Sequence, residues 1–199
     1  STETLMDEWA PPENTRQVPP APRVHTAPED IEKLVDRLVT ATSPVVLTEA
    51  AGREVETYRE LVKLCELLAL PVIEKPSALF ANFPKDHSLH QGHNISQYWD
   101  DMDLAVVIRT RVPWYPPSQN PPNATVAVID EEPHRSSMAY QSLQADMYLE
   151  GDAARTIRDI TSAIEQRGVN KDAVEQRRSK LAKSHDDLMK QKEALFELA

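Results

Sequence analysis

Residues 104–108 read LAVVI, an unbroken run of apolar side chains. Short runs of this kind are typical of parallel strands that are buried on both faces of a sheet. The other candidate strands are 45–48 (VVLT), 71–74 (PVIE), 124–130 (ATVAVID), 147–149 (MYL) and, as a short extra strand, Leu89-His90. The pattern therefore predicts an α/β domain with a Rossmann-like, doubly wound and mostly parallel sheet of five to six strands.

Several segments outside these runs have apolar residues at helical spacing. Three helices are therefore predicted, which begin after Thr26, after Arg53 and at Asp152. Thr26 and Glu29 have the spacing of a capping box, and Asp152 is placed to cap the third helix with its carboxylate. Ser96 is a further candidate cap, for a short helix before the LAVVI run. We expect these helices to pack on the sheet.

The domain organisation is suggested by proline, which occurs 16 times against four glycines. Prolines gather near the N-terminus and between residues 113 and 122, which indicates extended chain. We expect a proline-rich linker at 1–25, a central α/β domain at 26–168 and a charged helical linker at 169–199. A chain of this length has room for one good core, so we expect a domain excised from a larger protein.

Apolar residues on the outer segments are candidate contact surfaces. In the C-terminal segment, leucines recur every seven residues, but the complementary positions of the heptad are polar, which makes a coiled coil weak. We therefore expect this helix to dock one edge onto a neighbouring domain or a second copy of the chain. The residues predicted to form contact surfaces are Trp114, Tyr115, Leu181, Leu188 and Leu195.

The charge and cysteine content exclude several classes of partner. The formal net charge of −10 argues against nucleic acid and anionic membranes as partners. The chain has no apolar run long enough to span a membrane. Cys65 is the single cysteine, so no internal disulfide can form, and we expect a reducing, cytoplasmic setting.

Candidate binding residues lie after the predicted strands, because open parallel sheets bind ligands beyond the carboxyl ends of their strands. Gly52, Arg53, Arg109 and Asp130 occupy such positions and form a candidate nucleotide cleft, in which the aspartate would accept from a ribose or an adenine. The alternative is a vestigial cleft filled by its own side chains. Glycine-rich turns let phosphates approach the backbone closely, and this turn offers Gly52 alone beside the carboxylate of Glu49.

Other reactive side chains receive ordinary structural interpretations. His87, His90 and His93 stand three residues apart, and this spacing suits a shared metal ion only in an irregular chain. We therefore predict no metal site. Cys65 lies on the apolar face of a predicted helix, where a thiol is inert. We predict no catalytic residue in the chain.

Several short sequences occur together in one known family. They are Asp86-His87-x-Leu89-x-x-Gly92, Asp103, Val112-Pro113-Trp114, Asn123-Ala124, Ile129-Asp130-Glu131-Glu132-Pro133 and Gly151-Asp152. On these residues, the segment from about Pro28 to Glu165 resembles the central domain of thiamine-diphosphate-dependent enzymes of the acetolactate synthase type.

The resemblance implies a parent enzyme with three α/β domains, a lyase or transferase that decarboxylates or ligates 2-oxo acids. Its first and third domains would hold thiamine diphosphate and Mg²⁺, and its middle domain would carry flavin, ADP or nothing. The Gly-Asp-Gly metal motif of the third domain is not matched, because Ala153 follows Gly151-Asp152. We therefore expect a non-catalytic, structural chain that contains no cofactor of its own and contacts flanking thiamine-diphosphate-binding domains.

Two alternatives remain open at this point. One is a stand-alone nucleotide-binding module for ADP, FAD or NAD, and the other is an oligomerisation module that forms a homo-oligomer through the C-terminal helix. Flavin is disfavoured, because the Glu49-Ala50-Ala51-Gly52 turn is poor in glycine compared with flavin-binding relatives.

Overall fold

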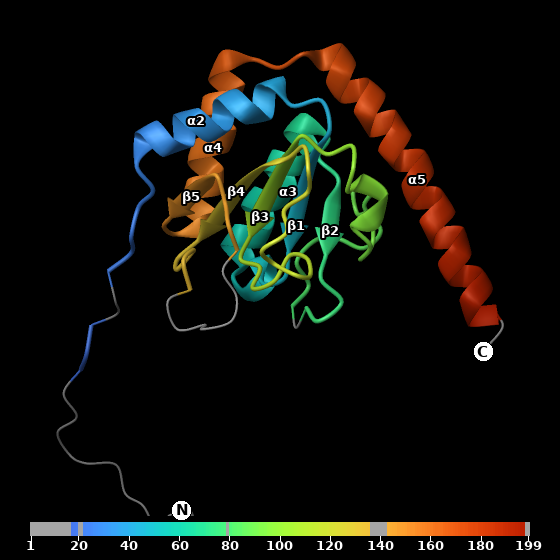
Figure 1. The fold of residues 1–199 in the computed structure, drawn as a ribbon, viewed down its shortest axis with the longest axis horizontal. Helices are drawn as coiled ribbons and strands as arrows, with labels where there is room; N and C mark the ends of the chain where they lie inside the picture. The colour runs from blue at the N-terminus through green and yellow to red at the C-terminus, as the bar shows by residue number, and fades with distance from the viewer. Residues whose placement is uncertain (1–16, 20–21, 79, 136–142, 198–199) are drawn as a thin grey trace, which may run out of the picture.

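A five-stranded sheet forms the centre of the protein in a computed structural model that describes residues 17–19, 22–78, 80–135 and 143–197 (Figure 1). All pairings between neighbouring strands are parallel, and the order is β2-β1-β3-β4-β5. The strands are β1 (Pro44–Thr48), β2 (Val72–Glu74), β3 (Leu104–Ile108), β4 (Thr125–Asp130) and β5 (Met147–Glu150). The predicted α/β fold with a Rossmann-like parallel sheet is confirmed.

The sixth strand predicted at Leu89-His90 is reduced to an isolated parallel bridge between His90 and Val72. Backbone hydrogen bonds still join this segment to β2, since the Gln91 amide donates to the Val72 carbonyl and the Glu74 amide donates to the Gly92 carbonyl. Gly92 has a φ of 79°, a left-handed conformation outside the range of a regular strand.

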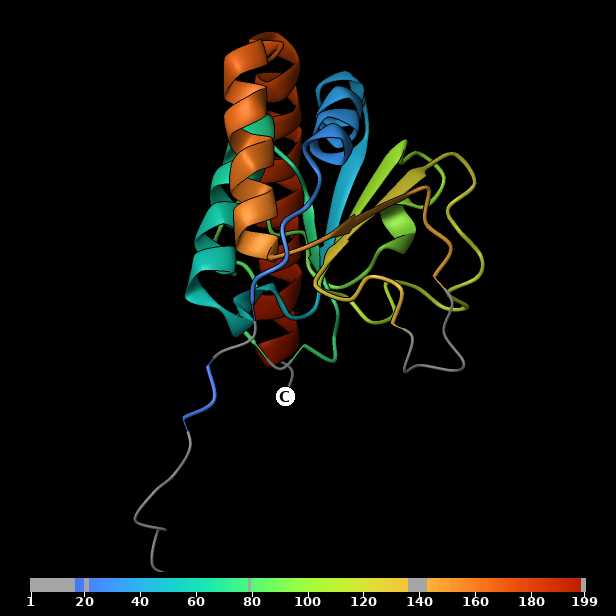
Figure 2. The same cartoon turned by 90° about the vertical axis from the view of Figure 1, so that its left-hand side faces the viewer.

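Helices cover one face of the sheet. They are α2 (Pro28–Thr40), α3 (Val55–Leu68), α4 (Ala153–Arg167) and α5 (Lys171–Glu197). Alternate strand residues such as Val46, Val106 and Ile129 are buried in the same cluster as the inner faces of these helices. Figure 2 shows α3, α4 and α5 on the same side of the sheet. Burial of this apolar layer contributes most of the stability of the domain.

The other face of the sheet is covered by irregular segments. The short 3₁₀ helix η2 (Ser96–Tyr98) and the loop after β3 bring Trp99 and Trp114 together, edge to face, with ring centroids 5.8 Å apart. Trp114 is buried against the second row of strand residues, which includes Val107 and Val128. In the described residues, no α-helix takes part in this second cluster.

Two predicted helix caps are wrong. Thr26 does not cap α2, because its hydroxyl contacts the Glu150 carbonyl and the Thr156 hydroxyl and so joins the chain to β5 and α4. Ser96 does not cap η2 through its side chain; its amide instead donates to the side chain of Asn94. Asp152 does cap α4, since its carboxylate accepts from the amide of Arg155, as predicted.

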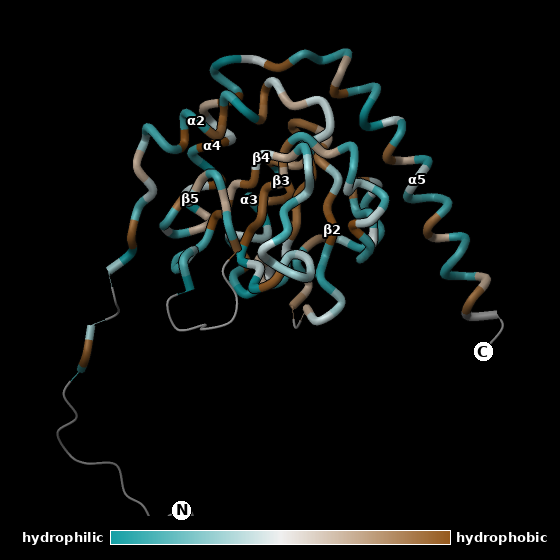
Figure 3. The backbone as a smooth tube through the Cα atoms, in the orientation of Figure 1, coloured by the Kyte–Doolittle hydropathy of each residue, from teal (hydrophilic) through white to brown (hydrophobic). Residues whose placement is uncertain are grey.

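The C-terminal helix α5 packs on its own domain along part of its length. Leu181 is only 5 % exposed and belongs to the main core, whereas Leu195 is 68 % exposed. The expectation of exposed contact residues is therefore wrong for Leu181 and for Trp114, which is 3 % exposed. Tyr115 and Leu195 are exposed and Leu188 is half-buried, and their role as contact residues stays a prediction. Figure 3 shows the hydrophobic residues concentrated in the strands, while α5 is mostly hydrophilic.

Arginines attach α5 to the ends of two other helices. Arg177 donates to the carbonyls of Leu68, at the end of α3, and of Ala41, just after α2, at 2.8 and 3.0 Å. Arg178 donates to the Glu66 carbonyl at 2.6 Å. Carbonyls at helix C-termini have no partner within their helix and carry partial negative charge, so cations are favourable there. No helix in the described part of the chain is long and apolar enough to cross a membrane.

Candidate functional site

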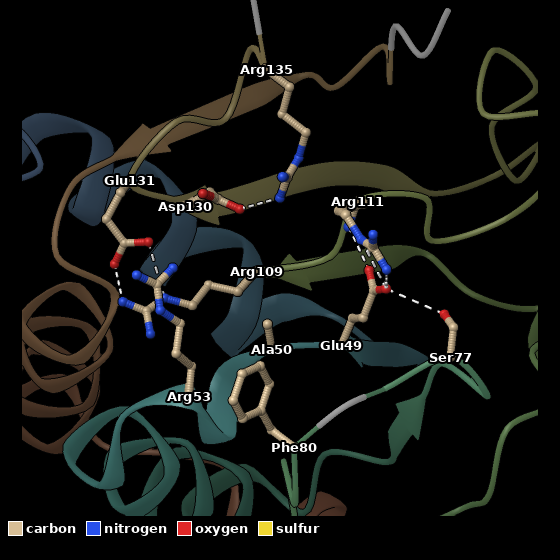
Figure 4. A pocket seen from close by; sticks show the side chains of 10 residues that line it. All are labelled: Glu49, Ala50, Arg53, Ser77, Phe80, Arg109, Arg111, Asp130, Glu131 and Arg135. Carbon is tan, nitrogen blue, oxygen red and sulfur yellow. Dashed lines mark hydrogen bonds and ion pairs between the residues drawn. The ribbon is translucent and has the colours of Figure 1, made fainter. Parts of the chain in front are cut away.

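A cavity of about 160 Å³ opens beyond the carboxyl ends of β1, β3 and β4 (Figure 4). It lies where the strand order reverses between β1 and β3, which is the place where open α/β sheets bind ligands. Its lining residues are Glu49, Ala50, Arg53, Ser77, Phe80, Arg109, Arg111, Asp130, Glu131 and Arg135. The cavity is smaller than the roughly 300–1,000 Å³ that small-molecule sites usually offer.

The first ion pair of the cavity joins Glu49 and Arg111. The Glu49 carboxylate accepts from the backbone amide of Arg111 at 2.9 Å, from its Nε at 3.1 Å and from the Ser77 hydroxyl at 3.2 Å. Burial alone would raise the pKa of Glu49, but these hydrogen bonds outweigh burial and lower it. Glu49 is therefore a paired carboxylate, and the repulsion that it would exert on a phosphate is already offset by Arg111.

The second ion pair lies on Arg109, which is 5 % exposed. Its guanidinium contacts the carboxylates of Glu131 and Glu54, and its Nε donates to Glu131 at 3.0 Å. These carboxylates raise the pKa of Arg109 despite its burial. Arg109 also has a φ of 45°, an uncommon left-handed backbone conformation for a residue with a side chain. Its Nη1 is buried without a hydrogen-bond partner among the described residues.

The third ion pair joins Asp130 and Arg135. One oxygen of the Asp130 carboxylate contacts the Arg135 guanidinium, and the other accepts from the amide of Glu132 at 3.1 Å. Both oxygens are therefore engaged within the protein, and the hydroxyls of a ribose would have to displace these contacts. Figure 4 shows the three pairs arranged around the opening of the cavity.

Gly52 serves packing in this structure. A Cβ atom at this position would lie 1.9 Å from the carbonyl oxygen of Ala81, so only glycine allows the segment after β2 to approach. The Gly52 amide donates to the side chain of Asn82 at 2.9 Å, and the Asn82 amide group donates to the Glu49 carbonyl. The backbone amide that a phosphate would need is therefore already bonded.

The four predicted site residues Gly52, Arg53, Arg109 and Asp130 come from the ends of three strands, and three of them line the cavity. Arg53 is exposed, while Gly52 faces Ala81. No ligand role of these residues is established by this arrangement. Sequence reasoning assigned no role to Arg111, Arg135 and Asn82, although arginines just after strands are a signal for the first two.

Of the three histidines at 87, 90 and 93, the fold directs His87 toward α3 and leaves His90 and His93 close to each other. His87 contacts Glu66 on α3, with Nε2 and Oε1 3.3 Å apart, whereas the His93 ring contacts the Glu74 carbonyl at 2.9 Å. His90 is completely buried, and its Nε2 lies 3.5 Å from the Glu74 carboxylate. Within the ranges that the structure describes, no three residues of metal-binding type come close enough to hold a metal ion.

Cys65 and the Gly151-Asp152 pair also have structural roles. Cys65 is buried in the core, and burial raises the pKa of its thiol, so the reactive thiolate is disfavoured. Gly151-Asp152 lies at the junction between β5 and α4, where Asp152 caps the helix and pairs with Arg23 at 3.0 Å. The Asp152 carboxylate therefore has protein partners.

Comparisons with known proteins agree with this architecture. The family model described as the central domain of thiamine pyrophosphate enzymes matches residues 31–160. No curated protein matches the chain. The solved structure of benzoylformate decarboxylase from Polynucleobacter necessarius is similar with a TM-score of 0.60 and 21% identity, over 78% of this chain and 30% of that chain.

A Mycobacterium smegmatis protein described as a thiamin diphosphate-dependent enzyme is similar with a TM-score of 0.59 and 24% identity, over 76% of this chain and 30% of that chain. At these identities the two structures support the fold alone, and the chain spans 30% of the length of each. The family model, by contrast, covers more than half of the chain. With its five parallel strands, its flanking helices and this match, the chain belongs to the family of thiamine pyrophosphate enzyme central domains.

Proposed function

We propose that this chain is the structural, non-catalytic central domain of a thiamine-diphosphate-dependent enzyme that decarboxylates or ligates 2-oxo acids. The observation that carries the proposal is the cavity at the switch in strand order. Three arginine–carboxylate pairs, on Glu49, Arg109 and Asp130, occupy the place where a relative would bind a nucleotide. Because ion pairs of the protein itself occupy this cleft, the domain is better suited to a structural role beside its neighbouring domains than to binding a nucleotide.

The residues of the cavity do not fit a flavin. A dinucleotide needs a backbone turn that its phosphates can approach closely, whereas the Gly52 amide is bonded to Asn82 and faces the Ala81 carbonyl. The cavity of about 160 Å³ is also below the usual size of cofactor sites. We therefore propose that the central domain carries no FAD.

Flanking domains would supply the chemistry of the parent. Thiamine diphosphate and Mg²⁺ would be held there, in a lyase or transferase. We propose that residues 1–25 and 169–199 are the linkers to those domains and that 26–168 is the domain between them. The structural neighbour from Polynucleobacter is a benzoylformate decarboxylase, and benzoylformate is therefore included among the substrates tested below. A homo-oligomer and a cytoplasmic setting are part of the same proposal, the latter because Cys65 is the single cysteine.

Calorimetry tests the non-catalytic role directly. The 199-residue chain is titrated with thiamine diphosphate in the presence of Mg²⁺, and decarboxylation of pyruvate and benzoylformate is assayed in parallel. We expect no heat of binding, no turnover and no visible flavin absorption after gentle purification. Tight binding of thiamine diphosphate, or a bound flavin, would overturn the proposal.

A nucleotide-binding module is the second candidate, and one observation favours it. Arg109 lines the cavity, and its Nη1 is buried without a partner in the described part of the chain. An anion that reached this atom would supply the missing hydrogen-bond acceptor. Titration with ADP distinguishes the two candidates, because saturable binding that is lost in Arg109→Met would support a nucleotide site, and no binding would support the structural role.

A further inference from the structure

A buried polar cluster lies at the end of β2, outside the lining of the cavity. Glu74 is completely buried, and its carboxylate accepts from the amides of Asn82 and Phe83 at 3.1 and 2.9 Å. The ammonium of Lys85 contacts the same carboxylate. One negative charge is therefore already matched by one positive charge and two amide donors.

His90 lies against the Glu74–Lys85 ion pair, and within the described ranges no further acidic group lies beside it to stabilise a protonated ring. Its ring is completely buried, and neither ring nitrogen has a hydrogen-bond partner among the described residues. Its Nε2 is 3.5 Å from the Glu74 carboxylate, which Lys85 already neutralises. The nearest other ring on the same segment is that of His93, 6.1 Å away between centroids. A proton on His90 would add an unmatched charge to a buried site.

The helix α5 closes this cluster. His185 on α5 is 5 % exposed, and its Nδ1 donates to the His90 carbonyl at 2.7 Å. One turn earlier, the Leu181 carbonyl accepts from Gln91 at 3.0 Å, and one turn later Leu188 packs on Gly92. The next basic residue along the same face of the helix is Lys192, whose charge acts on the cluster. Docking of α5 therefore adds the positive charge of Lys192 and removes water from His90.

From this geometry we infer that docking of α5 is a pH-sensitive latch, which holds the middle of the helix most firmly at neutral pH and loosens it in mild acid through protonation of His90. The groups that face His90 are Glu74, Lys85, His93, His185 and Lys192. Apart from Glu74, all of them are basic, so they oppose a proton on His90.

The direction follows from proton linkage. In the docked state, burial and the neighbouring lysines lower the pKa of His90 from its ordinary value of 6.5 to about 3, and burial also lowers that of His93. Release returns the rings to water, so the released state binds more protons between these values. Docking is strongest well above about pH 6.5 and weakens as the pH falls through and below that value. Uptake of one proton by His90 lowers the equilibrium constant for docking about tenfold between about pH 7.5 and about pH 5.5.

Amide hydrogen exchange tests the latch in the 199-residue chain. Protection of the amides in residues 181–192 is measured from about pH 7.5 to about pH 5.5 and corrected for the intrinsic rate at each pH. We expect protection to fall about tenfold in the wild type, while amides in β1 and β3 keep theirs. His90→Gln removes the more deeply buried titrating ring and should lessen the fall, leaving the part that His93 contributes. His87→Asn is the matched control, since His87 contacts Glu66 on α3, and it should behave as the wild type.

A histidine titration by NMR keeps the test decisive if His90→Gln does not fold. The ring signals of His90 in the wild type should not titrate while α5 remains protected. Protection of residues 181–192 that is independent of pH, or an unchanged fall in folded His90→Gln, would overturn the inference. An ordinary titration of His90 with α5 still protected would overturn it as well.

Discussion

Gly52→Ala is the substitution that separates a packing glycine from a phosphate-binding one. The new Cβ would lie 1.9 Å from the Ala81 carbonyl oxygen and 2.6 Å from its carbonyl carbon, whereas Cβ atoms essentially never approach closer than 3.0 Å. Both neighbours are backbone atoms, so no side chain can rotate away. The segment that carries Ala81 and Asn82 has to move as a unit.

The expected cost has two parts. Overpacking of a close contact costs about 1–3 kcal/mol. The displaced segment also strains the hydrogen bonds of Asn82, whose side chain accepts from the Gly52 amide and donates to the Glu49 carbonyl, and each lost bond costs about 1 kcal/mol. We expect a loss of about 2–4 kcal/mol in the free energy of unfolding, and a fall of about 4–16 °C in melting temperature for a chain of this size.

Thermal and urea unfolding of purified Gly52→Ala, followed by circular dichroism, measure this loss. Gly168→Ala is the matched control, because Gly168 has a φ of 80° and a Cβ added there would meet no atom within 4 Å. That variant incurs only the cost of a backbone conformation that side chains rarely adopt, about 1–3 kcal/mol, with no overpacking. If Gly52→Ala melts at the temperature of the wild type, the turn has room for a Cβ atom, and Gly52 does not exclude the close approach of a phosphate.

Three further predictions concern α5 and the cavity. Leu181→Asp should cost at least about 3 kcal/mol in urea unfolding, because it places a carboxylate in the core, while Leu195→Asp at an exposed position should unfold as the wild type. Arg177→Ala should increase the proteolysis of α5, since the carbonyls of Leu68, Ala41 and Thr42 lose their donor. Lys180→Ala should not, and equal cleavage of both variants would refute the anchoring role. The pKa of Glu49 is lowered from 4.5, so its ion pair stabilises the fold above that pH and is lost in stronger acid. Glu49→Gln lacks this titrating group. In urea titrations at each pH, it should therefore lose less stability than the wild type between neutral pH and about pH 3.

The strands were predictable because their apolar runs are short and continuous, and such runs have few alternatives in a parallel sheet. LAVVI at 104–108 became β3 without a shift at either end. The helix caps were harder to predict from the sequence, because a threonine hydroxyl such as that of Thr26 can bond equally well to a carbonyl far away in the sequence. Whether the Glu150 carbonyl lies within reach depends on the tertiary fold. Local spacing carries no information on such tertiary partners.

The cavity was predictable in position and less so in content. The rule of the carboxyl ends places Arg109 and Asp130 at the edge of the sheet where the cavity lies, because it depends on topology alone. The pairing of Arg111 with Glu49 depends on how two loops approach each other, and the burial of Leu181 depends on the angle at which α5 returns to the domain. Neither quantity is encoded in the spacing of residues along one segment.

The attachment of α5 through Arg177 has a mechanical consequence. A pull on the C-terminal end of this helix would first strip the contacts of Leu188 and His185, and would reach Arg177 last. Because Arg177 holds the ends of both α2 and α3, tension that arrives there would act on two helices of the core together. The C-terminal end of the helix can therefore move more easily than the part around Arg177. Small displacements beyond residue 192 would leave the sheet undisturbed.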